Sequence, residues 1–275
     1  MPRTISQPTR RFVPNPRASR VWLWVRLTAG VALLGGVAFA AKEVNAWLTH
    51  DPHFQLACEA APKDAVANCV SLEIRGAVYS SKTRLEAVFA QDFGTSVFHI
   101  PMAERRRHIL AVDWVDTAAI SRVWPNRIVV TVTERKPIAF AKLPIGDSAR
   151  YRFALIDEAG VLLSLPPRVR FRLPVVSGLT EQQTEAERSR RLKAASHLLE
   201  DLGPLAANVS EVNAANTDDM RVVTEIGGHA VELWIGDQRY RSRYQHFVAN
   251  YGEIQKHTTD SSVFDLRMDD RIAAR

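Results

Sequence analysis

Acidic side chains are absent from the first 42 residues of this 275-residue sequence. The same stretch holds seven basic residues: Arg3, Arg10, Arg11, Arg17, Arg20, Arg26 and Lys42. The other 29 Lys and Arg residues are balanced by the 30 Asp and Glu residues that follow. Because a body without net positive charge lacks the field that draws a protein to a nucleic-acid backbone, we expect no nucleic-acid partner.

Local catalytic signatures are missing as well. The sequence contains no G-x-S-x-G elbow, no H-E-x-x-H, no P-loop and no G-x-G-x-x-G. Its eight histidines are scattered, and the adjacent Asp269 and Asp270 would point to opposite faces of a strand. We therefore expect no catalytic residue, no cofactor and no metal ion. An extracytoplasmic enzyme whose site is assembled from distant residues stays an alternative.

One long apolar run is present, from Val21 to Ala41, and only Arg26 and Thr28 interrupt it. A helix of that length spans about 30 Å, which is enough to cross a bilayer. Trp22 and Trp24 are typical of the aromatic belt at a membrane interface, where the arginine stem can snorkel beside them. The run predicts a single transmembrane anchor over residues 21–41.

The basic flank predicts the orientation of this anchor. Residues 1–20 form a basic cytoplasmic tail under the positive-inside rule, so the rest of the chain faces the periplasm of a two-membrane cell. This is the topology of a single-pass type II protein of the cell inner membrane. The competing interpretation is a cleaved signal peptide, because Ala38-Phe39-Ala40 fits an A-x-A cleavage site.

Cysteine is scarce, and the two cysteines, Cys58 and Cys69, bracket a polar, alanine-rich segment. Since both lie on the expected oxidising side of the membrane, a disulfide that closes a local loop is the leading interpretation. A zinc site that includes His50 and His53 is an alternative with a looser pattern. Two unpaired thiols are the third interpretation.

Residues 42–53 show weak periodicity and predict a tether. The regular pattern that follows predicts the order strand, helix, helix, strand, strand. The signals are the alternation that ends at Gly76, helices behind Ser80-Ser81 and from Pro101, and strands on either side of Pro125-Asn126. Such a β-α-α-β-β unit buries two helices against one face of a small sheet.

Beyond residue 140 the pattern is mainly β with two helices. Hairpins are predicted around Asp157–Gly160 and Gly227-Gly228. A capping box predicts that one helix begins at Thr180, and a stripe of apolar residues predicts a buried helix face over residues 240–254. The last predicted strand is Val263–Met268. The fold class is therefore α+β.

Several segments resemble, in order and spacing, the POTRA domain of the FtsQ (DivIB) family of bacterial cell-division proteins. They are Glu73–Gly76, Val97–Ile100, Trp114–Ala118, Ser121–Asn126 and Glu134–Ala139. Leu155–Val161, Leu173–Gly178 and Phe264–Arg267 resemble the β domain of that family. The resemblance implies a POTRA-like domain with a cysteine-containing insertion over 54–139 and an FtsQ-type β domain over 140–275.

The same resemblance implies a function. FtsQ-like proteins are bitopic scaffolds of the divisome, at the division septum, that link early division proteins to septal wall synthesis. The implied partners are proteins of the FtsB and FtsL type, with FtsK, FtsW and FtsI types as further partners. A POTRA-containing envelope chaperone or secretion-complex component is the first alternative function.

Partner-binding residues are expected on the last strand: Val263, Phe264, Asp265, Leu266, Arg267 and Met268. The physical reason is that an edge strand leaves N–H and C=O groups free for a partner strand. Arg122, Glu134 and Arg135 are the surface candidates of the POTRA-like domain, and Trp124 is expected in its core. Met268 and Arg271 depart from the family pattern, which has Tyr and Gly there.

Overall fold

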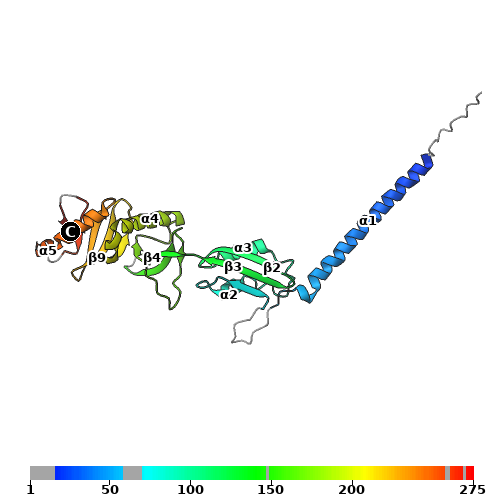
Figure 1. Ribbon diagram of the computed structural model, residues 1–275, viewed down its shortest axis with the longest axis horizontal. Coiled ribbons are helices and arrows are strands. Elements are labelled where there is room, and N and C mark those ends of the chain that lie inside the picture. Colours follow the sequence, from blue (N-terminus) through cyan, green and yellow to red (C-terminus); the bar gives the residue numbers. More distant parts are fainter. Residues whose placement is uncertain (1–15, 58–69, 147–148, 258–260, 269–270) are drawn as a thin grey trace, which may run out of the picture. The chain divides into compact units, whose positions relative to one another are not determined.

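The computed structural model describes residues 16–57, 70–146, 149–257, 261–268 and 271–275. It confirms an α+β fold with an N-terminal apolar helix, a β-α-α-β-β unit and a mostly β C-terminal region (Figure 1). The chain divides into two compact units. The first consists of the chain up to Glu73 with Phe89–Met102 and Ile120–Val129, and the second of Ile74–Val88, Ala103–Ala119 and Val130–Arg275. The sequence-based domain boundaries stay predictions.

Helix α1, Pro16–His50, is longer than the predicted anchor. The expected tether begins as helix because Lys42–His50 holds no Gly or Pro, and the 3-10 helix η1 begins only at Pro52 (Pro52–Phe54). Within α1, Trp24–His50 is long and apolar enough to cross a membrane. The Arg26 guanidinium lies 3.5 Å from the centre of the Trp22 ring, as expected for an arginine beside a belt residue.

The β-α-α-β-β unit contains a three-stranded sheet in the order β1-β3-β2. Its elements are β1 (Leu72–Arg75), α2 (Lys82–Ala87), α3 (Met102–Leu110), β2 (Val115–Val123) and β3 (Arg127–Glu134). Ser81 caps α2 by accepting a hydrogen bond from the Arg84 N–H. Gly76 ends β1 with φ 82°, and a Cβ there would lie 2.1 Å from the Val132 carbonyl oxygen, so only glycine fits.

The second unit is built on a nine-stranded sheet in the order β12-β11-β10-β9-β8-β7-β4-β5-β6. Its strands are β4 (Pro137–Pro144), β5 (Tyr151–Asp157), β6 (Leu162–Leu163), β7 (Val175–Ser177), β8 (Val209–Asn213), β9 (Met220–Ile226), β10 (His229–Gly236), β11 (Val263–Asp265) and β12 (Ala273–Ala274). Three neighbouring pairs, β4 with β7, β7 with β8 and β10 with β11, are parallel. The other pairs are antiparallel.

Helices α4 (Glu185–Leu202) and α5 (Tyr240–His257) share a core with this sheet, and the 3-10 helix η2 (Gly203–Asn208) follows α4. The predicted buried face of α5 is confirmed, because Tyr244 and Phe247 are fully buried. The Tyr244 hydroxyl forms a 2.8 Å hydrogen bond with Thr224 Oγ1, so its polar end is satisfied inside the core.

Two local expectations were wrong. The cap of helix α4 is Thr184, four residues after Thr180, and it accepts a hydrogen bond from the Glu187 N–H. Trp124 is 52% exposed and lies in the turn between β2 and β3, not in the core. The fully buried tryptophan of this region is Trp114, whose Nε1–H donates to the Ser164 carbonyl.

Candidate partner-binding surfaces

The end of the large sheet is formed by β12, and β11 lies between β12 and β10. Strand β11 pairs with β10 in parallel, with Phe264 opposite Leu233, and with β12 in antiparallel, with Phe264 opposite Ala274. The Arg275 N–H donates to the Val263 carbonyl at 3.0 Å. Since amides alternate sides along a strand, the Ala274 N–H and C=O point away from β11. Within the described residues, that outer row is unpaired.

The predicted strand Val263–Met268 is regular only to Asp265. It stops there because the Asp265 carboxylate turns back and accepts a hydrogen bond from the Arg267 N–H at 3.2 Å. Phe264 and Leu266, two of the expected partner-binding residues, are buried in the core under α5. Met268 is exposed and does not share the burial of Phe264 and Leu266, because the strand has already ended.

Trp234 of β10 lies on the sheet face opposite the helices, and three arginines surround its ring. The guanidinium groups of Arg221 and Arg275 lie 3.8 Å from the ring centre, and that of Arg267 lies 5.0 Å away. The indole N–H donates to Glu232 at 2.9 Å. Cation–π contacts of this kind hold the ring and the cations in a fixed arrangement beside the sheet edge.

Acidic residues balance these arginines. Asp265 forms ion pairs with Arg267 at 2.6 Å and with Arg275 at 2.8 Å, and Asp219 lies 3.4 Å from Arg267. The hydrogen bond from the Arg267 side chain is the main reason that the pKa of Asp265 is lowered to about 2. The same pair raises the pKa of Arg267. The Arg267 charge is therefore already neutralised within the chain.

Glu134, a surface candidate of the β-α-α-β-β unit, is engaged inside the chain. Its carboxylate accepts hydrogen bonds from the backbone N–H groups of Val78, Tyr79 and Ser80 at 2.6–2.9 Å, and from the Ser80 hydroxyl. Burial raises the pKa of Glu134, but these hydrogen bonds lower it more, so the net pKa is lowered. The carboxylate fixes the loop between β1 and α2.

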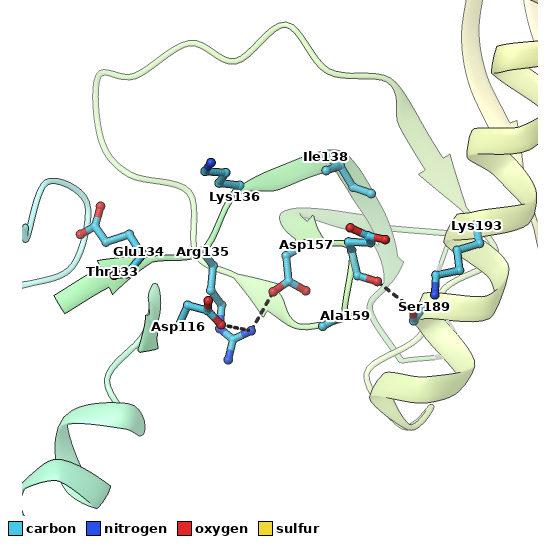
Figure 2. A pocket seen from close by; sticks show the side chains of 11 residues that line it. Asp116, Thr133, Glu134, Arg135, Lys136, Ile138, Asp157, Ala159, Ser189 and Lys193 are labelled. Carbon is cyan, nitrogen blue, oxygen red and sulfur yellow. Dashed lines mark hydrogen bonds and ion pairs between the residues drawn. The ribbon is translucent and has the colours of Figure 1, made fainter. Parts of the chain in front are cut away.

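Arg135 lies between Asp116 and Asp157, as Figure 2 shows, at distances of 3.5 and 2.8 Å. Asp157 also accepts a hydrogen bond from the Val161 N–H, so Arg135 braces the turn between β5 and β6. Around these residues is an open hollow of about 670 Å³, with Lys136 and Lys193 also in its lining (Figure 2). Both acidic and basic side chains line this hollow.

Arg122, the third surface candidate, donates to the carbonyl oxygens of Val97 and Ile100, at 2.7 Å each. It therefore fixes the loop before α3. Arg122 belongs to the first compact unit and the 263–268 segment to the second. Cys58 and Cys69 lie outside the described residues, and their pairing stays a prediction.

The charged cluster around Trp234 was missed at the sequence level. Its members come from β9, β10 and the segment after β11, and no local motif joins them. One signal was available. Trp234 alternates with Leu233 and Ile235, its neighbours on either side in the strand, and because both of these are buried, Trp234 faces the other way. A large aromatic residue on a solvent face deserves notice as a binding candidate.

A family model described as POTRA domain, FtsQ-type, matches residues 70–135. Cell division protein FtsQ of Koribacter versatilis is 30% identical over 273 residues, which covers 96% of this chain and 73% of that protein. The chain belongs to the FtsQ family. FtsQ of Myxococcus fulvus is 27% identical over 234 residues, 82% of this chain and 73% of that protein.

FtsQ of Novosphingobium aromaticivorans is 25% identical over 247 residues, 89% of this chain and 68% of that protein. The matches to these FtsQ proteins thus extend well beyond the POTRA segment into the large sheet. Together with the candidate membrane helix Trp24–His50, the one such helix among the described residues, they identify a cell-division protein with a POTRA domain.

Proposed function

We propose that this FtsQ-family chain is a bitopic, non-enzymatic scaffold of the divisome. Its N-terminus lies in the cytoplasm, the chain that follows the anchor lies in the periplasm, and the protein links early division proteins to septal wall synthesis. Its partners are proteins of the FtsB and FtsL type, with FtsK, FtsW and FtsI types as further partners. The family membership and the candidate anchor support this proposal.

The observation that carries the partner-binding role is the outer edge of β12. A partner segment that adds a strand there would complete the row of N–H and C=O groups that faces away from β11. The segment Val263–Met268 supports that edge from behind: Arg267 shares the Asp265 carboxylate with Arg275, and Met268 lines one hollow together with Ile272. Because Arg267 is already paired with Asp265, a partner carboxylate would have to compete for its charge.

Proline substitutions at Ala273 and Ala274 are expected to have different effects, because the two amides point to opposite sides of β12. The Ala274 N–H points outward, so Ala274→Pro removes a donor that the sheet itself does not use. The Ala273 amide points toward β11, so Ala273→Pro damages the sheet. Proline at Phe264 or Leu266 would damage it as well, since the Leu266 N–H donates to the Trp234 carbonyl at 2.9 Å.

The test is the affinity of the full chain in detergent for the periplasmic segment of its FtsB-type partner, measured by titration calorimetry. Ala274→Pro should weaken binding at least tenfold, about 1.4 kcal/mol, and leave the circular dichroism and melting curve unchanged. The control Ala274→Val keeps the amide donor and should bind as wild type does. If the folded proline variant binds with wild-type affinity, β12 is not the docking edge.

A second experiment tests the scaffold role as a whole. Depletion of the protein should give long, undivided filaments, because septal wall synthesis would lose its link to early division proteins. Envelope leakage without filamentation would instead support the chaperone or secretion alternative. Normal cell shape with loss of an activity would support an enzyme.

A further inference from the structure

An aromatic cluster lies at the end of the candidate membrane helix, entirely within the first compact unit. The Trp47 ring of α1 meets the Phe54 ring edge-on with centroids 5.0 Å apart. Phe54 meets Trp124 at 5.8 Å, and Trp124 meets Phe98 at 5.8 Å. Four rings from three separate segments are therefore linked by ring contacts into one cluster that begins on α1.

Only one of these four rings is used to build the core. Phe54 is buried, whereas Trp47 is 57%, Trp124 52% and Phe98 47% exposed. Apolar surface that is contiguous and exposed marks a contact site more often than scattered apolar residues do. Folding alone does not account for three large aromatic side chains left half in solvent on one patch.

Exposed polar side chains neighbour the rings along the chain. His50 and His53 lie beside Trp47 and Phe54 in the chain, His99 follows Phe98, and Arg127 follows the turn that carries Trp124. Aromatic rings mixed with cationic or titratable groups are typical of the zone where a protein meets lipid headgroups. An anionic headgroup would match the Arg127 charge.

We infer that Trp47, Trp124 and Phe98 form a membrane-docking surface that seats this unit on the interfacial layer of the bilayer. The inference rests on the proposed transmembrane anchor. The occupant is lipid because the surface continues the candidate span: Trp47 belongs to Trp24–His50, and ring contacts join it to Trp124. The turn between β2 and β3 thus touches the same interface that receives the end of α1.

The experiment uses the full chain labelled with 5-fluorotryptophan in nanodiscs of phosphatidylethanolamine and phosphatidylglycerol. The six tryptophans, Trp22, Trp24, Trp47, Trp114, Trp124 and Trp234, give six fluorine signals that single Trp→Phe variants assign. Lipid carrying a nitroxide near its headgroup then broadens the signals of rings at the interface. The Trp124 signal should broaden as strongly as that of Trp47.

A matched pair of variants adds a control. Phe98→Ser removes a neighbouring ring of the surface and should reduce the broadening of the Trp124 signal. Phe153→Ser replaces a phenylalanine of β5 with a similar exposed fraction, 48%, and should leave that broadening unchanged. Both positions are half exposed, so neither substitution empties the core.

The outcomes that would overturn the inference differ from those that would overturn the anchor. If Trp22, Trp24 and Trp47 broaden and Trp124 keeps its full intensity, the docking surface is wrong and the anchor stands. If none of the four broadens, the anchor fails and the inference fails with it. A Trp124 signal that changes only when a partner protein is added would make this face a protein interface.

Discussion

The Glu134 carboxylate serves as the partner for three consecutive backbone amides, those of Val78, Tyr79 and Ser80. These amides lie between β1 and α2, where no strand or helix supplies an acceptor. Hydrogen bonds to a charged acceptor are stronger than neutral ones. Glu134, which the sequence suggests as a surface determinant, therefore has a structural role. A partner that bound this carboxylate would have to leave its hydrogen bonds to the loop intact.

Glu134→Gln should speed hydrogen exchange at Val78–Ser80, because the amide offers one acceptor oxygen and no charge. The expected loss of local protection is about 2 kcal/mol at neutral pH. Since the folded pKa is lowered from 4.5, the wild-type advantage is full above pH 4.5 and disappears as pH falls through the lower folded value. The exposed Glu158→Gln variant is the control and should change nothing at these amides.

Trp114 and Trp124 make a second comparison between residues of the same type. Trp114 is buried, packs near Tyr79 and Phe171, and donates its N–H to Ser164. Trp114→Ala should therefore cost about 3–5 kcal/mol in the free energy of unfolding. Trp124→Ala loses only ring contacts at the surface and should cost less than about 2 kcal/mol.

Chemical denaturation of the protein in detergent, followed by circular dichroism, measures both values. Equal destabilisation by the two substitutions would contradict the assignment of Trp114 to the core and Trp124 to the surface. The same measurement also shows whether Trp124 variants fold, which the membrane-docking experiment requires.

At the scale of elements, regular periodicity predicted the order of the β-α-α-β-β unit and both long helices of the C-terminal region, but it did not single out β4, β7, β8 or β12. The alternation before Gly76 and the apolar stripe of α5 each matched an observed element. Periodicity is clear there because one face of each element packs against the core and the other faces solvent. The ends of elements were less predictable. The last strand stopped at Asp265 through a side-chain hydrogen bond to the Arg267 amide, which periodicity does not encode.

The candidate site was predictable only in part for a similar reason. The sequence pointed to the last strand, but pairing of β11 with both β10 and β12 depends on contacts between segments that are distant along the chain. The same holds for the arginines around Trp234. Sheet order and cation–π clusters are properties of tertiary packing, so a local pattern cannot supply them.

The start of α4 gives a prediction at this scale. Thr184 accepts a hydrogen bond from the Glu187 N–H as the helix cap, whereas the Thr180 N–H donates to the Gln183 side chain outside the helix. Thr184→Ala should cost about 1 kcal/mol of stability through loss of the cap. Thr180→Ala keeps its backbone donor and should cost less than half of that. A reversed order in denaturation would return the cap to Thr180.

At the scale of the whole molecule, the excess positive charge lies at the N-terminal end of the chain. The first 42 residues carry seven basic residues and no acid, while the remainder is balanced. Positive charge on one flank of an apolar helix sets its orientation in the membrane. We therefore predict that the N-terminus stays cytoplasmic and that the helix is not cleaved. A C-terminal tag should be digested by protease added to spheroplasts, and an N-terminal tag should be protected.

Cleavage is the alternative that this prediction must exclude, because Ala38-Phe39-Ala40 fits a signal-peptidase site. In the structure these residues lie in the middle of α1, which runs on without a break to His50. Intact mass of the protein from membranes should equal that of the uncleaved chain, and Ala40→Leu should leave processing unchanged. A mature form that begins at Ala41 or Lys42, abolished by Ala40→Leu, would make this an exported protein without an anchor.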